Sequence, residues 1–386
     1  MKFKNTYLIL PYVIDILSKL FLEIIYKREQ DSYSCIKFRR NRYIYIIHKF
    51  LCSKTHSLGI LNRTISPFKY LRMNKYARLI YKLENTFPVA RLPHNITKKV
   101  FYYDNYDTKY HLLPWGKKVF IDYGIPQEKP EVPWMLMPYS MHPVTYKYCD
   151  EMNLTHYRGK KRVGKLFFIG NFSSEYNTFG ASPHIQKEFS MLSRMDILNI
   201  IYNKQGEFGE AIQIFNLCED FNSLLYHNYR QILYVNKFVL PGSPDVRISQ
   251  KKWLPVLSMF DFFLAPPGVQ MPLCHNIIEA IAVGTIPFTN YYNWFEVPLE
   301  DGKNCIAFND EKELLQGIHR ILNMSKDQIK EMRENVILYY KNYLNPEAFV
   351  NRIYDSSSDN IHVSVILEDS DLIKSINKKS FLFVKK

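Results

Sequence analysis

The feature that most constrains this chain is a strand–loop–helix–strand pattern in its last third. Phe260–Ala265 is a short apolar run, the form of a strand buried on both faces, and a Pro-Pro-Gly loop ending at Gly268 stops it. A helix is expected to begin at Pro272, since proline suits the first helical position, and to end at Gly284. Thr285–Phe288 then begins a second strand. The pattern predicts a βαβ unit, and open sheets of this kind bind ligands at the carboxyl ends of their strands.

The polar residues of this expected helix share one side. His275, Asn276 and Glu279 lie at i, i+1 and i+4, apart from the apolar residues that would pack on the sheet. His275 and Asn276 fall in the first turn, where unpaired N–H groups and the helix dipole favour an anion such as a diphosphate. Glu279 lies one turn further, where its carboxylate suits the vicinal hydroxyls of a ribose. The alternative is a capped helix with a solvated polar face.

The run Trp253–Phe288 resembles the nucleotide-sugar half of GT-B glycosyltransferases, closest to the exostosin-like pattern. The resemblance rests on Leu264-Ala-Pro-Pro-Gly268 and on Glu279-Ala-Ile-Ala-Val-Gly-Thr-Ile-Pro287. It implies that Glu279 holds the ribose of the donor. Met271, eight positions before Glu279, stands where the common retaining pattern has a first glutamate. This departure favours an inverting reaction.

The resemblance also implies the architecture: an α/β protein with two Rossmann-like domains facing a cleft, and a C-terminal helix that crosses back to the first domain. The basic stretch Tyr157–Arg162 marks the expected hinge. We therefore expect an acceptor-side domain over residues 1–160, a nucleotide-sugar-binding domain over 161–355 and a C-terminal tail over 356–386.

Alternating strand and helix patterns support a parallel sheet in the second domain. Lys165–Ile169 is an expected strand that ends in Gly170-Asn171, a loop that the resemblance places near the donor phosphates. The other expected elements are helices at Ile185–Tyr202, Phe215–Leu225, Glu311–Asn323 and Lys326–Tyr343, and strands at Asn236–Leu240 and Ile361–Leu367.

Basic side chains and one histidine complete the expected site. Arg247 or Lys251 supplies a cation for the diphosphate, together with the backbone amides after Gly268. An inverting reaction also needs a general base near the acceptor hydroxyl, and His142, close to the expected hinge, is preferred. Structural roles are the alternative for His142 and Arg247. The other candidates for the base are His56, His94, His111, Asp104 and Asp122.

The net charge of +14 admits nucleic acid, an anionic membrane surface or phosphorylated substrates as partners. Aromatic and basic residues interleave in Arg42-Tyr-Ile-Tyr45, which would suit stacking on bases. No nucleic-acid-binding motif accompanies them, so no nucleic acid is expected. The basic run Lys37–Arg42 also reads as a solvated face.

The amino terminus and the cysteines indicate a cytoplasmic protein. Tyr7–Ile25 is apolar at helical spacing but too charged to span a membrane, and it lacks a signal-peptide cleavage site. It either packs in the core or lies on the inner face of the membrane. The six cysteines show no zinc spacing, and Asp369-Ser-Asp371 reads as a solvated acidic turn, so no metal is expected.

These observations predict a metal-independent, inverting glycosyltransferase without a cofactor, active in surface polysaccharide synthesis. Its donor would be a UDP- or GDP-linked sugar, and its acceptor a glycan or a lipid-linked molecule. Two alternatives stay open. One is a basic, aromatic-rich nucleic-acid-binding protein without catalysis, and the other is a nucleotide-sugar hydrolase or epimerase.

Overall fold

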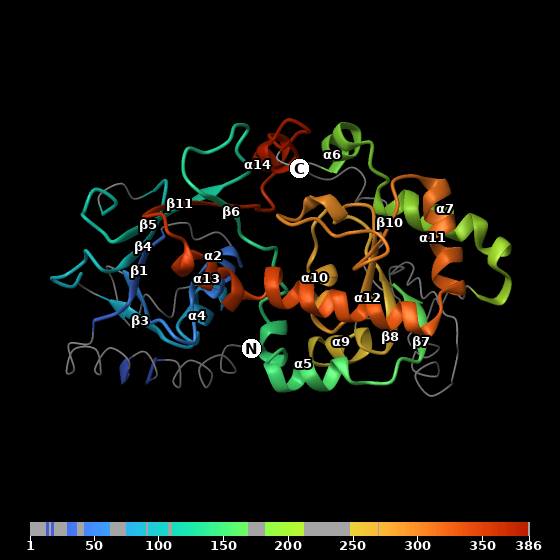
Figure 1. Ribbon diagram of the computed structural model, residues 1–386, viewed down its shortest axis with the longest axis horizontal. Helices are drawn as coiled ribbons and strands as arrows, with labels where there is room; N and C mark the ends of the chain where they lie inside the picture. The colour runs from blue at the N-terminus through green and yellow to red at the C-terminus, as the bar shows by residue number, and fades with distance from the viewer. Residues whose placement is uncertain are drawn as a thin grey trace, which may run out of the picture. The chain divides into compact units, whose positions relative to one another are not determined.

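The structure is a computed structural model that describes residues 13–14, 17–18, 29–36, 42–61, 75–89, 92–106, 110–168, 182–211, 248–268 and 270–384. The chain forms two compact units. Unit 1 comprises Met1–Pro138 and Asn345–Val365, and unit 2 comprises Tyr139–Leu344 and Ile366–Lys386. Each unit is built on one sheet of parallel strands (Figure 1). The α/β class expected from the sequence is confirmed.

Unit 1 has a seven-stranded sheet in the order β3-β2-β1-β4-β5-β11-β6. Helix α2 packs against α4 and α13. The strands are β1 (Ser32–Cys35), β2 (Leu58–Leu61), β3 (Thr86–Val89), β4 (Val100–Asp104), β5 (Lys117–Tyr123), β6 (Trp134–Leu136) and β11 (Asn360–Val365), and the helices are α2 (Tyr43–Leu51), α4 (Lys75–Ile80) and α13 (Pro346–Asp355).

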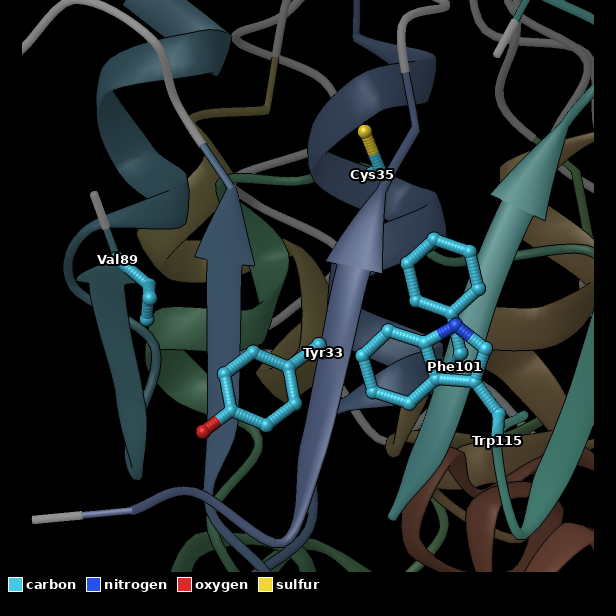
Figure 2. Close-up of a cluster of buried hydrophobic side chains, with 5 residues drawn as sticks. All are labelled: Tyr33, Cys35, Val89, Phe101 and Trp115. Atoms are coloured by element: carbon cyan, nitrogen blue, oxygen red, sulfur yellow. The ribbon is translucent and has the colours of Figure 1, made fainter. Parts of the chain in front are cut away.

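The core of unit 1 contains aromatic side chains on one face of this sheet. Figure 2 shows Tyr33 and Cys35 from β1, Val89 from β3, Phe101 from β4, and Trp115 from the segment before β5. Because Tyr33 and Phe101 are register partners on neighbouring strands, their side chains point to the same face. The Trp115 ring stacks on Phe101, with ring centroids 4.4 Å apart and planes 6° apart.

Unit 2 has a four-stranded sheet in the order β10-β9-β8-β7, with strands β7 (Gly164–Phe167), β8 (Phe260–Leu264), β9 (Ile286–Thr289) and β10 (Ile306–Ala307). The described α-helices of this unit are α5 (Glu151–Arg158), α6 (Ser182–Phe189), α7 (Arg194–Lys204), α9 (Gln250–Leu257), α10 (His275–Ala282), α11 (Glu311–Asn323), α12 (Lys326–Tyr339), α14 (Ser370–Lys374) and α15 (Phe381–Val384). The 3-10 turn η1 (Thr145–Tyr148) precedes α5.

The strand–loop–helix–strand pattern is confirmed as β8, α10 and β9, with β8 and β9 paired in parallel. Gly284 follows the helix with φ of 76°, the left-handed conformation that suits glycine at a helix end. The helix begins at His275, later than expected from Pro272. The reason is that the Pro272 carbonyl accepts a hydrogen bond from the Gly268 N–H at 2.9 Å, which keeps Pro272 in the loop.

Other expected elements differ in their bounds. The Ile185–Tyr202 pattern forms two helices, α6 and α7, because Ser190 adopts φ of 51° and Ser193 caps α7 through the Asp196 N–H. The Lys326–Tyr343 helix continues as a π-helical turn over Tyr340–Leu344. Expected elements at Phe215–Leu225 and Asn236–Leu240, and most of Tyr7–Ile25, lie outside the described residues.

The division into units differs from the expected domains in two places. Residues 139–160 belong to unit 2, because hydrogen bonds to α10, described below, hold their first part, and Arg158 donates to the Ala282 carbonyl at 2.9 Å. The chain returns to unit 1 at Asn345, so α13 packs on α2, and the expected tail strand is β11, paired between β5 and β6. None of the described helices is both long and apolar enough to cross a membrane.

Candidate functional site

The candidate site lies at the carboxyl edge of the sheet in unit 2. Strand β8 ends at Leu264 and leads through Ala265–Gly268 toward the first turn of α10. Strand β9 ends at Thr289 at the same edge, since the two strands run parallel. Cys274 stands at the N-cap of α10 and makes no side-chain capping hydrogen bond. The first backbone N–H groups of an α-helix have no partner within the helix, so this end favours an anion.

The loop after β8 is shaped by its glycine. A Cβ added to Gly268 would lie 2.6 Å from the Met271 carbonyl oxygen, so no other residue fits without a shift of the backbone. Arg194, at the start of α7, donates from Nε to the Pro267 carbonyl at 3.0 Å and so restrains the backbone of the loop. The contact of Arg194 with this loop was not predicted, because nothing in the local sequence distinguishes Arg194 from a surface arginine.

Glu279 is the most constrained polar residue of α10. Its Oε1 accepts hydrogen bonds from the His142 backbone N–H at 3.0 Å and from the Thr145 hydroxyl at 2.8 Å. Its Oε2 accepts one from the Trp253 indole N–H at 2.5 Å. The residue is 2% exposed. Burial raises the pKa of Glu279 to about 7, against the lowering effect of the three hydrogen bonds.

The second tie between α10 and the segment Tyr139–Thr145 is made by His275. Its Nδ1 lies 2.6 Å from the Ser140 carbonyl oxygen, and because a carbonyl only accepts, Nδ1 carries the proton. The ring stacks on Tyr139 with centroids 5.2 Å apart, and it stands edge-on to the His142 ring with centroids 5.6 Å apart. The structure therefore brings His142 and His275 together, as the sequence analysis did not foresee.

The His142 ring is oriented by its own segment. The Val144 backbone N–H donates to His142 Nδ1 at 3.3 Å, so the proton of a neutral His142 lies on Nε2. A ring in this state donates from Nε2. This tautomer suits a hydrogen bond from Nε2 to an anion. The general-base role expected of His142 requires the other tautomer and stays a prediction.

The expectation that Glu279 lies on an open side of the helix is not met. The Tyr139–Thr145 segment and the Trp253 side chain from α9 cover that side, and sequence periodicity does not reveal what covers a helix. Neither Thr145 nor Trp253 was a candidate residue. Trp253 opens the stretch that carries the family resemblance, but a tryptophan on a helix is ordinarily a core residue.

The remaining candidates are scattered. Lys251 is exposed in the first turn of α9, and Asn276 is half-buried in the first turn of α10. Gly170, Asn171 and Arg247 lie outside the described residues.

The other candidates for the base belong to unit 1. His56 stacks on Tyr354, His111 stacks on Tyr103, and His94 is exposed. Asp104 is buried and accepts from the Tyr123 hydroxyl at 2.8 Å, and Asp122 lies 3.3 Å from His362 Nε2.

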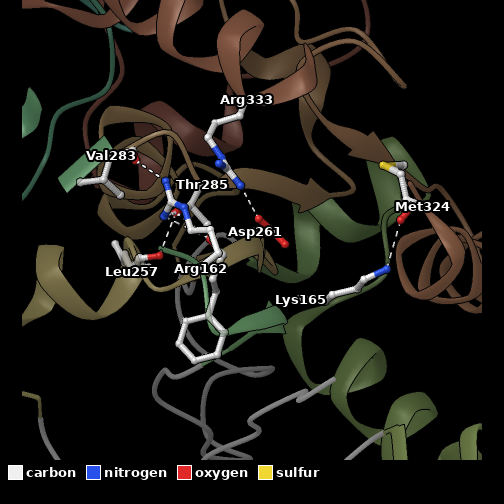
Figure 3. A network of polar contacts seen from close by, with 9 residues as sticks. Arg162, Lys165, Leu257, Asp261, Val283, Thr285, Met324 and Arg333 are labelled. Carbon is white, nitrogen blue, oxygen red and sulfur yellow. Dashed lines mark hydrogen bonds and ion pairs between the residues drawn. The ribbon is translucent and has the colours of Figure 1, made fainter. Parts of the chain in front are cut away.

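A second polar network lies near the amino end of β8 (Figure 3). Asp261 forms an ion pair with Arg333 of α12. Arg162 donates to the Val283 carbonyl at 2.9 Å and to the Phe260 carbonyl and the Thr285 hydroxyl at 3.2 Å. Burial lowers the pKa of Arg162 to about 9. Burial also raises the pKa of Asp261, which the charges of Arg333 and Arg162 oppose.

Among the described residues, no three His, Cys, Asp or Glu side chains lie together in a way that could hold a metal ion.

Comparison with known proteins gives a distant likeness. No protein-family model and no curated protein matches the sequence. Among solved structures, the N-terminal domain of Candida albicans trehalose-6-phosphate phosphatase matches with 9% identity and a TM-score of 0.39, over 84% of this chain and 96% of that chain. An E. coli structure described as trehalose-6-phosphate bound with UDP-2-fluoro glucose matches with 10% identity and a TM-score of 0.37, over 84% and 99%. Anabaena HepE in complex with UDP and glucose matches with 9% identity and a TM-score of 0.35, over 85% and 99%. At this distance the likeness carries no conclusion about the activity of this chain.

Proposed function

We propose that this protein is a glycosyltransferase of the GT-B type that uses a nucleoside-diphosphate sugar, UDP- or GDP-linked, as its donor. The observation that carries the proposal is the Gly268 loop and the first turn of α10 at the carboxyl edge of a parallel sheet. This is the edge where open α/β sheets bind ligands. His275 and Asn276 lie in that first turn, and the backbone amides there favour a diphosphate.

The chemistry follows from the residues at this edge. Helix amides stabilise the charge that develops on the leaving diphosphate, and the transfer needs no bound metal. Lys251 and Arg247 would add cationic charge. Met271 is 2% exposed and provides no carboxylate where a retaining enzyme of the common pattern has one, so we propose that the reaction inverts the sugar.

The acceptor is proposed to bind to unit 1. A glycan or a lipid-linked acceptor agrees with the excess of basic residues in the first 120 positions of the chain. Synthesis of a surface polysaccharide, an exostosin-like subfamily and attachment to the inner face of a membrane belong to the same proposal.

Thermal stabilisation by nucleotides tests the proposal. UDP or GDP at one hundred times its Kd adds about 2.7 kcal/mol of stability, so the unfolding temperature should rise by several degrees. Gly268→Ala should abolish the effect, because the new Cβ would meet the Met271 carbonyl.

Gly206→Ala is the matched control, since a Cβ at Gly206 would meet nothing within 4 Å. A panel of nucleotide sugars, assayed for hydrolysis with and without acceptors, then identifies the donor. Salt-sensitive binding to oligonucleotides without any stabilisation by nucleotides would reject the proposal and favour the nucleic-acid-binding alternative.

A further inference from the structure

The surroundings of Glu279 differ from those of a residue that binds a ligand. Both carboxylate oxygens already accept hydrogen bonds from the protein, and the residue is buried. Because Glu279 is 2% exposed, a ribose diol would reach the carboxylate only if the covering segment or the Trp253 side chain moved aside. Since the donors come from two separate segments, the carboxylate acts as a junction between α9, α10 and the chain that enters unit 2.

We propose that Glu279 is a positioning residue of the donor site: it fastens the segment Tyr139–Thr145 to α10 and thereby fixes His142 and His275, without touching the ribose. The inference rests on the proposed function insofar as His142 Nε2–H and the first turn of α10, which begins at His275, face a nucleotide diphosphate. The resemblance to glycosyltransferases implies a direct ribose contact, so the two roles give opposite expectations for the same residue.

Two ties, one helical turn apart, hold the segment on α10. The first joins His275 Nδ1 to the Ser140 carbonyl at 2.6 Å, and the second joins Glu279 to the His142 N–H and the Thr145 hydroxyl. Between them the His142 carbonyl accepts from the Thr145 N–H at 2.8 Å, which closes a turn. The backbone of His142 is thus held on both its N–H and its carbonyl sides.

This arrangement defines what each imidazole presents. His142 receives a hydrogen bond at Nδ1, so its neutral ring presents a proton on Nε2. His275 gives its Nδ1 proton to Ser140, so its neutral ring presents a lone pair on Nε2. A shift of the segment would disturb both rings together, because the Ser140 carbonyl and the His142 backbone belong to it.

Glu279→Gln is the informative substitution because it keeps the size of the side chain. One end of the glutamine amide is a donor, and it must face either the Trp253 indole N–H or the donors from His142 and Thr145. Either the contact to the Trp253 indole or the two contacts to the segment Tyr139–Thr145 are therefore lost, and the negative charge is removed in both cases.

A comparison of ligands separates positioning from ribose contact. Binding of UDP and of 2′,3′-dideoxy-UDP is measured by calorimetry in the wild-type protein and in Glu279→Gln. We expect Glu279→Gln to weaken UDP binding about tenfold, the scale of one charge-assisted hydrogen bond. Removal of the ribose diol should weaken binding by the same factor in both proteins. If removal of the ribose hydroxyls weakened binding in the wild type but not in Glu279→Gln, the proposal would be overturned, and Glu279 would bind the ribose directly.

A second measurement needs no nucleotide. Backbone hydrogen exchange in a peptide covering residues 139–149 should be at least tenfold faster in Glu279→Gln, with β8 unchanged. Thr145→Val, which leaves Glu279 in place, should accelerate the same peptide to a smaller extent. Glu347→Gln is the matched control in unit 1, because Glu347 also accepts from a hydroxyl, of Ser53, and from a backbone N–H, of Lys54.

Unchanged exchange over residues 139–149 in both Glu279→Gln and Thr145→Val would overturn the proposal. If the wild-type protein bound neither UDP nor GDP, the proposed function would fail, while the exchange measurement would still decide whether Glu279 fastens the segment.

Discussion

Two carboxylates in unit 2, Asp261 and Glu279, are largely removed from solvent but have different hydrogen-bond donors. Asp261, near the amino end of β8, pairs with Arg333 and lies in the field of Arg162 and Lys165. Glu279, on the helix that follows β8, accepts hydrogen bonds only from uncharged groups of His142, Thr145 and Trp253 among the contacts that the structure describes. Burial raises the pKa of both carboxyls, but only Asp261 has cations that oppose the rise.

The comparison shows that the charge of the hydrogen-bond donors, and not burial alone, determines how far the pKa of a buried carboxyl rises. The charges of Arg333 and Arg162 oppose the rise in the pKa of Asp261, and its ion pair with Arg333 joins β8 to α12. Uncharged donors leave the charge of Glu279 dependent on pH near neutrality. Carboxyls whose charge depends on pH near neutrality are common at functional sites, whereas carboxylates paired with cations are common in structural networks.

The largest expected effect comes from Asp261→Asn. It leaves the half-buried guanidinium group of Arg333 without its ion-pair partner and removes the negative charge near Arg162, so the free energy of unfolding should fall by about 3–5 kcal/mol. Urea unfolding of the whole protein measures it. Asp301→Asn is the control, because the Asp301–Arg320 pair is exposed and should contribute at most about 1 kcal/mol. If Asp261→Asn and Asp301→Asn lost the same unfolding free energy, the Asp261–Arg333 pair would contribute no more than an exposed surface pair.

A smaller effect is expected from the titration of Glu279. Its pKa rises from 4.5 to about 7 on folding, so the folded protein binds this proton more tightly than the unfolded chain. The stabilisation is therefore complete below pH 4.5 and is lost as the pH rises through about 7. Across this window it amounts to about 3 kcal/mol.

The measurement compares the unfolding free energies of the wild-type protein and Glu279→Gln between pH 4 and 8. Relative to Glu279→Gln, the wild-type protein should gain unfolding free energy as the pH falls from 8 to 4. If the difference in unfolding free energy stays constant from pH 4 to 8, Glu279 does not titrate in this range and the predicted rise of its pKa is wrong.

Local signals account for the part of the fold that the sequence predicts correctly. Proline and glycine mark the ends of β8 and α10, and the apolar runs between them are long enough to identify a strand and a helix. The return of Asn345–Val365 to unit 1 was not predictable in detail, because β11 pairs with strands more than 200 positions earlier in the chain. Nothing in its own sequence specifies β5 and β6 as neighbours.

The candidate site divides in the same way. The helix period correctly groups His275, Asn276 and Glu279 on one helix beside the Gly268 loop. It cannot show that residues 139–145 cover this helix, because that contact joins positions more than 130 apart in the sequence. For this reason the covering partners, and with them the role proposed for Glu279, come from the structure alone.

The smallest effect in this comparison concerns Trp253. Trp253→Phe removes one of the three donors to Glu279, and a lost hydrogen bond to the charged form raises the pKa of a carboxyl further. The midpoint of the pH dependence should therefore move upward by about half to one pH unit, roughly 1 kcal/mol. Trp134→Phe is the control, since its indole N–H donates to the Ser364 hydroxyl in unit 1. A midpoint that moves equally in both variants, or downward in Trp253→Phe, would mean that the indole does not stabilise the ionised carboxylate, and the three-donor account of Glu279 would then reduce to His142 and Thr145.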